Sequence, residues 1–282
     1  MEYQDILFEL TDGIALITLN RPAAMNTWTS LMAAELGHAM HRCDQDDDVH
    51  AVVITGSGER AFCAGADLSQ GGDTFAPGEN AEEEDAGEPS EVMSEAQHML
   101  PHEISKPVIA AINGHAVGVG MTYPMLADIR IVSETAKIAF PFVRRGVMPE
   151  LASHVTIAKV AGLSNAAELL LTGKTILGTE AAAMGVASRA LPQREVLPAA
   201  MAIAADIVTH AAPASVAVTK RFLWDGVDCS IDEMMEKENP VFAWLGGQDD
   251  ASEGVMSFVE KRPPKWRMTA QDIPAELFGK RD

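Results

Sequence analysis

The sequence has few cysteines, and they are scattered. Its 282 residues include only Cys43, Cys63 and Cys229, too few and too widely spaced for a disulfide framework. No cysteine or histidine pair has the spacing of a structural metal site, so we expect no bound metal. The scarcity of cysteine indicates a reducing compartment, and we expect a cytoplasmic protein.

Long apolar runs are also missing. The most apolar stretch, 196–208, contains Asp206 and is too short to span a bilayer. The first ten residues, MEYQDILFEL, are acidic and lack the basic and apolar regions of a secretory signal. We therefore expect a soluble protein.

Basic residues are also few in comparison with acidic ones. Lys and Arg number 21 against 41 Asp and Glu, which gives a formal net charge of −20. Such a surface repels phosphate backbones and anionic lipid headgroups, so we expect neither nucleic acid nor a membrane as partner. A small anionic ligand held by a few local cations remains compatible with this charge.

The apolar pattern predicts an α/β fold, with strands first and helices dominating the second half. Apolar runs bounded by turn residues predict strands at 2–10, 13–20, 49–55, 107–112, 129–132 and 137–140. The first two are expected to form a hairpin at 11–13, and the third, being mostly apolar, to be buried on both faces. Helical patterns cover 29–42, 91–104, 118–126, 149–161, 164–172, 179–185, 195–210, 213–224 and 230–245, and Thr29 or Ser30 could cap the first of them. The acidic, Gly- and Pro-containing segment 70–91 predicts a surface loop.

Two glycine-rich turns follow buried strands, CAGAD at 63–67 and HAVGVG at 115–120. Free backbone N–H groups at such turns are donors for an anion, and two turns side by side could direct two donors at one oxygen. The alternative is that the glycines only permit tight turns and close packing. Neither turn matches a phosphate-binding loop of the GxxxxGK[ST] type.

Five motifs occur in order along the chain: LNRPAAMN at 19–26, GERAFCAGADL at 58–68, KPVIAAINGHAVGVG at 106–120, ADIRI at 127–131 and GVMPE at 146–150. In this order they resemble the crotonase superfamily, the enoyl-CoA hydratase/isomerase family, from residue 5 to about 267. The resemblance implies a spiral of repeated ββα units over residues 1–200 and a helical oligomerisation region over 201–282. It also implies trimers or dimers of trimers.

The resemblance further implies a substrate and its contacts. In this family an acyl-CoA thioester carbonyl lies between two backbone amides, which here belong to Ala66 and Val119; coenzyme A enters as part of the substrate, with no tightly bound cofactor. Positions lining its path match Ala24, Met25, Ala64, Asp67 and Leu68. Near the C-terminus, Phe258 and Lys261 match residues that reach coenzyme A, often on the neighbouring subunit; a core aromatic and a solvated lysine are the alternatives.

Hydratases of this family use two glutamates, and both positions differ here. Thr122 stands at the first position and Phe142 at the second. Neither side chain is a base at neutral pH. Glu150 instead aligns with the base of a branch of Δ3,Δ2-enoyl-CoA isomerases. It follows Pro149, so the alternative is a carboxylate that stabilises the first turn of a helix.

These residues favour isomerisation of an unsaturated acyl-CoA, with Glu150 as the proton shuttle. Hydration by an atypical site, or acyl-CoA binding without catalysis, are the alternatives. His115 and His154 are candidate helpers. His115 could face the acyl pocket or satisfy turn backbone. His154 is four residues beyond Glu150 and is expected to share its helix face, where the imidazole could tune the carboxylate or simply pack.

Overall fold

The computed structural model describes residues 3–69, 71–75 and 98–278. A six-stranded sheet forms its centre, in the order β1 (Ile6–Thr11), β2 (Ile14–Leu19), β3 (Ala51–Gly56), β5 (Val108–Ile112), β7 (Ile129–Ser133) and β10 (Arg189–Leu191). The β1–β2 pair is the predicted hairpin and is antiparallel, whereas the other neighbours in this sheet run parallel.

A second, four-stranded sheet contains β4 (Ala61–Cys63), β6 (His115–Val117), β8 (Lys137–Ala139) and β9 (Thr175–Leu177). The chain visits the two sheets in turn, since β3 is followed by β4, β5 by β6, and β7 by β8. This alternation is the predicted spiral, and it brings the ends of β4 and β6 together although they lie about fifty residues apart in the chain.

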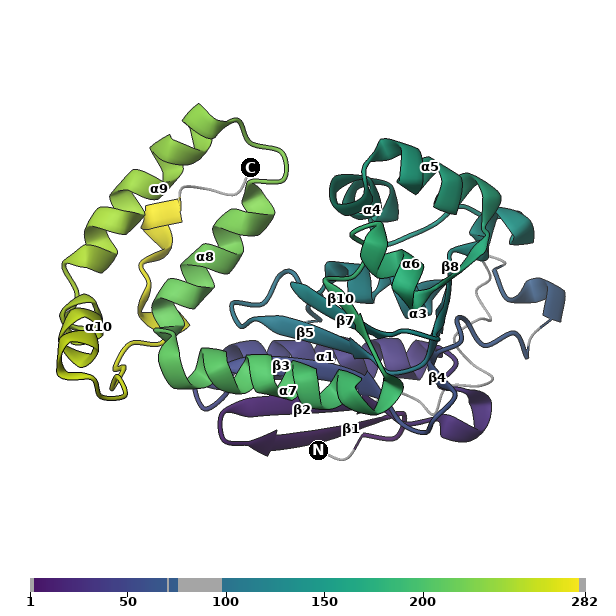
Figure 1. Cartoon of the computed structure of the whole chain (residues 1–282), viewed down its shortest axis with the longest axis horizontal. Helices are drawn as coiled ribbons and strands as arrows, with labels where there is room; N and C mark the ends of the chain where they lie inside the picture. The colour runs from purple at the N-terminus through teal and green to yellow at the C-terminus, as the bar shows by residue number, and fades with distance from the viewer. Residues whose placement is uncertain (1–2, 70, 76–97, 279–282) are drawn as a thin grey trace.

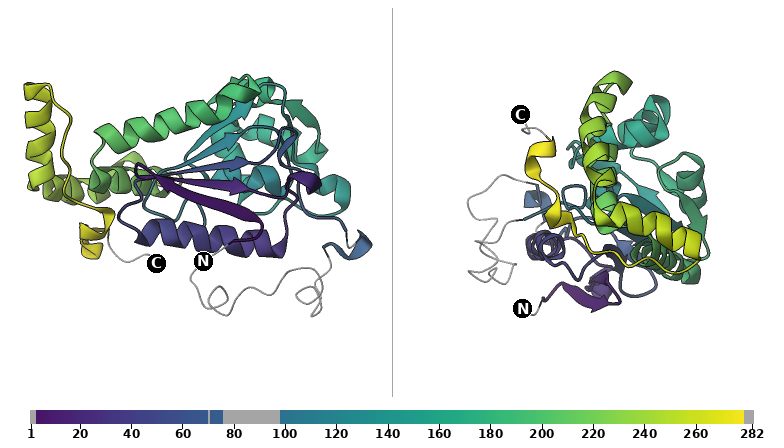
Figure 2. Two further views of the ribbon diagram at one scale, coloured as in Figure 1. Left: turned by 90° about the horizontal axis from the view of Figure 1, so that it is seen from below. Right: turned by 90° about the vertical axis from the view of Figure 1, so that its left-hand side faces the viewer.

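Helices cover both faces of the large sheet (Figures 1 and 2). On one face, α1 (Ser30–Gln45) begins at the expected cap, where the Thr29 hydroxyl accepts a hydrogen bond from the Met32 amide. On the other face, α7 (Gln193–His210) packs Val196, Ala200 and Ala204 against the strands. Burial on both sides explains why β3 reads as a continuous apolar run. The expected boundary at 200 falls inside α7.

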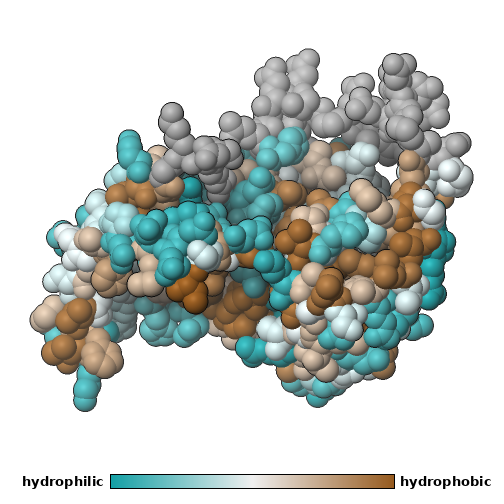
Figure 3. All heavy atoms as spheres, turned by 90° about the horizontal axis from the view of Figure 1, so that it is seen from above, coloured by the Kyte–Doolittle hydropathy of each residue, from teal (hydrophilic) through white to brown (hydrophobic). Residues whose placement is uncertain are grey.

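The helices after α7 form an arm beside the core, visible at the left of Figure 1: α8 (Pro213–Asp225), α9 (Ile231–Gly246) and α10 (Asp249–Glu260). Asp128 anchors α8, because its carboxylate lies 2.9 Å from the Lys220 ammonium and accepts a 2.7 Å hydrogen bond from the Trp224 indole. Apolar side chains remain exposed on the arm, including Phe242 and Phe258, and Figure 3 shows brown residues on its outer surface.

Several predicted helices differ in the structure. The helix expected at 149–161 is α4 (Ser153–Ala161), because Leu151 and Ala152 both have φ of 52°, outside the right-handed helical region. Residues 98–104 contain a turn at 101–103 and no helix, while 91–97 and most of the expected loop at 70–91 lie outside the described residues. Helix α10 was not predicted as a helix. The remaining helices include α3 (Val119–Thr122), α5 (Leu163–Thr172) and α6 (Gly178–Ala183).

A search of the described residues for a helix with the length and apolar character needed to cross a bilayer found none.

Candidate active site

The two glycine-rich turns lie side by side at one edge of the small sheet. Strands β4 and β6 pair in parallel, with Cys63 opposite Ala116, so both turns emerge in the same direction. Their packing leaves no space for side chains, because a Cβ on Gly65 would lie 2.9 Å from the Val117 carbonyl oxygen and one on Gly120 only 2.2 Å from that of Cys63. The glycines are therefore required for the backbones to approach each other.

Each turn presents an amide that makes no hydrogen bond to another described residue. The first turn is fixed by Trp28, whose amide donates to the Gly65 carbonyl (2.8 Å) and whose carbonyl accepts from the Asp67 amide (3.0 Å). The Ala66 N–H, which lies between these two bonds, has no hydrogen-bond partner among the described residues. The Val119 N–H begins α3, where helix geometry offers it no partner. Two unpaired amides on adjacent turns are what stabilisation of an oxyanion requires.

A cavity of about 400 Å³ adjoins Val119. Its walls are mostly apolar and aromatic, and the Trp28 and Tyr123 rings pack with centroids 5.0 Å apart. The described lining residues are Trp28, Ala33, Ala34, Gly37, His98, Met99, Leu100, Val119, Tyr123, Glu150 and Leu151. Within this described lining, Glu150 is the one carboxylate.

Glu150 is held by a hydrogen bond from α3. The Thr122 hydroxyl, which is fully buried, donates to Oε1 of Glu150 at 2.5 Å. Although part of Glu150 remains exposed, burial of its carboxyl raises the pKa, and the Thr122 bond opposes this by stabilising the ionised form. One carboxylate oxygen of Glu150 is therefore hydrogen-bonded to Thr122, and the carboxyl is more easily protonated than an exposed one.

The backbone around Glu150 is not helical. The Glu150 carbonyl accepts hydrogen bonds from the Ser153 amide (3.1 Å) and hydroxyl, which close the bend made by Leu151 and Ala152. Helix α4 begins only at Ser153. The alternative in which Glu150 stabilises the first turn of a helix is therefore wrong.

Comparison with known proteins identifies the family. The model of the enoyl-CoA hydratase/isomerase family matches residues 9–269. The chain belongs to this family. It is 30% identical over 262 residues to a short-chain-enoyl-CoA hydratase of Clostridium acetobutylicum, covering 93% of this chain and 97% of the relative. An enoyl-CoA hydratase of Alternaria alternata, ACTT3, is 32% identical over 266 residues, covering 94% and 86% of the two chains.

Solved structures agree with this assignment. A probable enoyl-CoA hydratase/isomerase from Mycobacterium abscessus superimposes with a TM-score of 0.82 at 39% identity, covering 93% of this chain and 98% of that one. An enoyl-CoA hydratase from Bacillus anthracis gives a TM-score of 0.79 at 26% identity, covering 93% and 99%. The α/β spiral described above is thus the fold of the enoyl-CoA hydratase/isomerase family.

Thr122 and Phe142 are the residues that the family resemblance places at the two hydratase glutamate positions. Thr122 is fully buried and donates to Glu150, while Phe142 is 8% exposed. The Phe142 ring lies against the second turn, since its Cζ would be 3.9 Å from a Cβ on Gly118. The Phe142 ring therefore lies beside the second glycine-rich turn, and this side chain cannot transfer a proton.

The two candidate helpers do not join this cavity. His154 is exposed on α4, and because Glu150 precedes that helix the two residues share no helix face; that prediction is wrong. The Nδ1 of His115 accepts a hydrogen bond from the Lys137 amide at 3.0 Å. His115 lines a different hollow, with Met25 and Ala64, so the expectation that it faces the acyl pocket is also wrong.

The residues expected along the coenzyme A path do not all line one hollow. Met25 and Ala64 line one hollow beside the turns. Ala24 ends the short helix Pro22–Ala24, and Leu68 is exposed after the first turn. The Asp67 carboxylate is occupied by the Arg21 guanidinium (3.0 Å) and the Thr27 hydroxyl (3.1 Å), which indicates that it fixes the turn.

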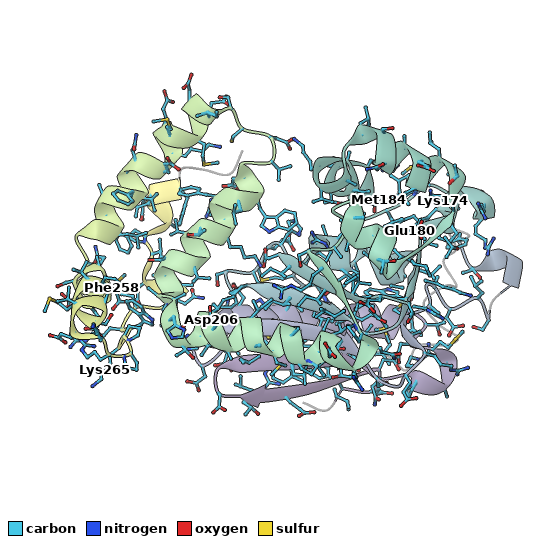
Figure 4. All side chains as sticks on the ribbon, in the orientation of Figure 1. Lys174, Glu180, Met184, Asp206, Phe258 and Lys265 are labelled. Atoms are coloured by element: carbon cyan, nitrogen blue, oxygen red, sulfur yellow. The ribbon has the colours of Figure 1, made fainter. Side chains whose placement is uncertain are left out.

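Phe258 and Lys261 lie far from these residues in the same chain. Phe258 is 85% exposed on α10, and Lys261 ends that helix. Figure 4 shows Phe258 on the arm and Lys174, next to the Gly173 and Thr175 of the hollow, on the opposite side of the molecule. A contact of either residue with substrate would therefore need a second copy of the chain.

Sequence reasoning missed two aromatic walls, Trp28 and Tyr123. Aromatic residues are only 5% of the chain, so each one near a motif is notable. Trp28 lies two residues after the motif at 19–26 and Tyr123 three residues after the motif at 106–120, and this proximity could have indicated a role in the site. Among the described residues, no group of His, Cys, Asp and Glu side chains could hold a metal ion.

Proposed function

We propose that this protein isomerises a 3-enoyl-CoA to the 2-enoyl-CoA, with Glu150 as the base. The observation that carries the proposal is that Glu150, the one carboxylate in the described lining, shares an apolar cavity with Val119, whose amide is unpaired; we call this cavity the acyl cavity. Moving a double bond by one position takes one proton off and puts one proton back, so one carboxylate is sufficient.

The proposed reaction has two proton transfers. Glu150 removes a proton from C2 of the substrate, and the electron pair moves toward the thioester oxygen to give a dienolate. The Ala66 and Val119 amides donate hydrogen bonds to that oxygen, an interaction worth about 10²–10³ in rate per donor in other enzymes. Protonated Glu150 then returns the proton at C4. A base of this kind contributes about 10²–10⁴.

The raised pKa of Glu150 suits this role. A carboxylate with an ordinary pKa is a weak base and a reluctant proton carrier near neutral pH, whereas burial shifts the pKa toward the working range. The Thr122 hydrogen bond opposes this shift, because it stabilises the ionised form of the carboxyl. The walls of the cavity around Glu150 are mostly apolar, which suits the hydrocarbon part of an acyl chain.

Hydration of a 2-enoyl-CoA is the second candidate, because the relatives from Clostridium acetobutylicum and Alternaria alternata are named enoyl-CoA hydratases. Hydration requires one group to activate water and a proton source at C2. Glu150 would have to supply both, since Thr122 and Phe142 replace the aligned glutamates. This requirement makes hydration the less favoured of the two.

The test measures both reactions on purified protein, with 3-enoyl-CoA and with 2-enoyl-CoA, for the natural chain and for Glu150→Gln. We expect isomerisation by the natural chain and a loss of about 10²–10⁴ in Glu150→Gln, with binding of a coenzyme A ester retained. Glu9→Gln, an exposed residue of β1, is the matched control and should not change either rate.

Three results would overturn the proposal. Hydration without isomerisation would favour the second candidate. Full isomerisation by Glu150→Gln would remove Glu150 from the mechanism. Binding of the ester with no turnover of either substrate would indicate a protein that binds acyl-CoA without catalysis.

A further inference from the structure

The acyl cavity has a buried hydroxyl in its wall that the proposed mechanism does not use. Tyr123, whose ring forms part of this wall, is only 4% exposed. Its hydroxyl oxygen is shielded from solvent and has no hydrogen-bond partner among the described residues. Such a group destabilises the folded chain, because the hydrogen bonds that it makes to water in the unfolded chain are not replaced.

Other hydroxyls near Tyr123 or of the same type are paired. The Thr122 hydroxyl donates to Glu150 at 2.5 Å, and the hydroxyl of Tyr3 is hydrogen-bonded to Nδ1 of His38 at 2.8 Å. In the part of the chain that the structure describes, Tyr123 carries the one buried hydroxyl that lacks a partner. Because buried polar groups are normally hydrogen-bonded, this exception indicates a partner that arrives with a ligand.

The Tyr123 side chain is held in one position. Its ring packs against the Trp28 ring with centroids 5.0 Å apart and planes at 52°, and its amide donates to the Val119 carbonyl at 3.0 Å. Burial raises the pKa of the hydroxyl, so the group keeps its proton and remains a donor. Tyr123 therefore offers a positioned donor without an acceptor.

The Tyr123 ring lies in the part of the cavity that must hold the rest of the acyl group. The reacting carbons belong near Glu150 and the Val119 amide, and the remaining wall consists mostly of aromatic, apolar and small side chains. His98, another polar residue of that wall, lies against Gly37, where a Cβ would be 2.6 Å from its Nδ1. It makes no hydrogen bond to the Tyr123 hydroxyl.

We propose that the acyl group of the substrate carries an oxygen beyond its reacting carbons, and that the Tyr123 hydroxyl donates a hydrogen bond to this oxygen. The inference rests on the acyl-CoA substrate of the proposed function, but not on which reaction follows. A hydroxyl or a carbonyl oxygen would serve, since both accept hydrogen bonds. A site of this kind discriminates against the analogue without the oxygen, because its own polar group then stays unpaired.

The experiment measures the binding of saturated acyl-CoA esters, which cannot be isomerised, to the full chain by calorimetry. Hexanoyl-CoA is compared with esters of the same length that carry a hydroxyl at C4, C5 or C6, or a carbonyl at C5. We expect at least one oxygenated ester to bind the natural chain about 3- to 10-fold more tightly than hexanoyl-CoA. In Tyr123→Phe, which keeps the ring, this preference should disappear.

Thermal unfolding of the free protein separates ligand binding from a structural role of the hydroxyl. Loss of an unpaired buried hydroxyl does not destabilise a fold, so Tyr123→Phe should unfold at the temperature of the natural chain or above it. The matched control is Tyr3→Phe, which removes the paired hydroxyl of the other tyrosine, outside the described cavity lining. It should unfold about 1–4 °C lower and keep the preference for the oxygenated ester.

Equal affinities of all these esters for the natural chain would overturn the inference. A preference that persists in Tyr123→Phe would also overturn it. So would a Tyr123→Phe variant that is destabilised as much as Tyr3→Phe, since the hydroxyl would then be bonded within the folded protein. Absence of binding by every ester would overturn the acyl-CoA proposal as well, whereas failure of isomerisation alone would leave the calorimetry readable.

Discussion

The acyl cavity and a hollow of about 360 Å³, which we call the cationic groove, lie on either side of one pair of turns, and their chemistry is opposite. The acyl cavity is apolar and contains one carboxylate, Glu150. The cationic groove contains Lys137, Arg144 and Arg145 and no described carboxylate. Between them stand the unpaired amides of Ala66 and Val119.

This difference separates two tasks. A carboxylate is a stronger base where burial raises its pKa, whereas binding of an anionic group needs cations that offer charge-assisted hydrogen bonds. A carboxylate among the cations would neutralise them, and an arginine beside Glu150 would lower the pKa of that carboxyl. Keeping the charges on opposite sides of the turns allows both groups to work.

The largest expected effect comes from a substitution in the second glycine-rich turn. In Gly120→Ala the new Cβ would lie 2.2 Å from the Cys63 carbonyl oxygen, so the second turn must move and the Val119 amide with it. We expect the rate to fall by about 10²–10³ and the unfolding free energy by about 1–3 kcal/mol. Thermal unfolding and single-turnover rates measure both. Gly246→Ala, where a Cβ meets no neighbour, should leave both unchanged; similar losses there would contradict the explanation.

A smaller effect should be confined to the acyl cavity. Thr122→Val keeps the volume but removes the hydroxyl that donates to Glu150. Because that bond stabilises the ionised carboxylate, its loss raises the pKa of Glu150 further, and the acid limb of kcat/KM moves to higher pH. Activity then disappears at a higher pH as the solution is acidified. Thr122→Ser should restore the profile, and an unchanged acid limb in the valine variant would exclude a role for Thr122 in setting the pKa.

Salt should act on the cationic groove alone, where the family resemblance leads us to expect coenzyme A beside Met25 and Ala64. Screening weakens contacts between exposed charges, so raising the ionic strength from 50 to 500 mM should increase KM for a coenzyme A ester about two- to fivefold, without changing kcat. A pantetheine ester lacks the phosphates and should show no such rise. Equal salt dependence for both esters would place the charge effect elsewhere.

The smallest expected quantity is the coupling between the two hollows. If they act separately, the free-energy effects on kcat/KM of Thr122→Val and of the combined Lys137→Gln and Arg145→Gln change should add to within about 0.5 kcal/mol. A double-mutant cycle with the four proteins measures this. A coupling of 1 kcal/mol or more would show that the two sides are not independent.

Much of the fold could be predicted from sequence because it depends on local patterns. The hairpin at Asp12 and Gly13, the cap at Thr29 and the doubly buried β3 all agree with the structure. The short strands β4 and β6 were missed, since three residues carry too little periodicity. The start of α4 was missed as well, because nothing in the composition of Leu151 and Ala152 indicates positive φ.

The sequence by itself determined the family, the spiral of α/β units, the glycines that bring two backbones together and the absence of both aligned glutamates. These follow from residue types at fixed spacing. Only the tertiary structure decided that Thr122 holds Glu150, that His115 and His154 stand outside the acyl cavity, and that three cations gather beside Met25 and Ala64. Such contacts join residues distant in the chain, and their side-chain directions depend on how the two sheets and the loops between them pack.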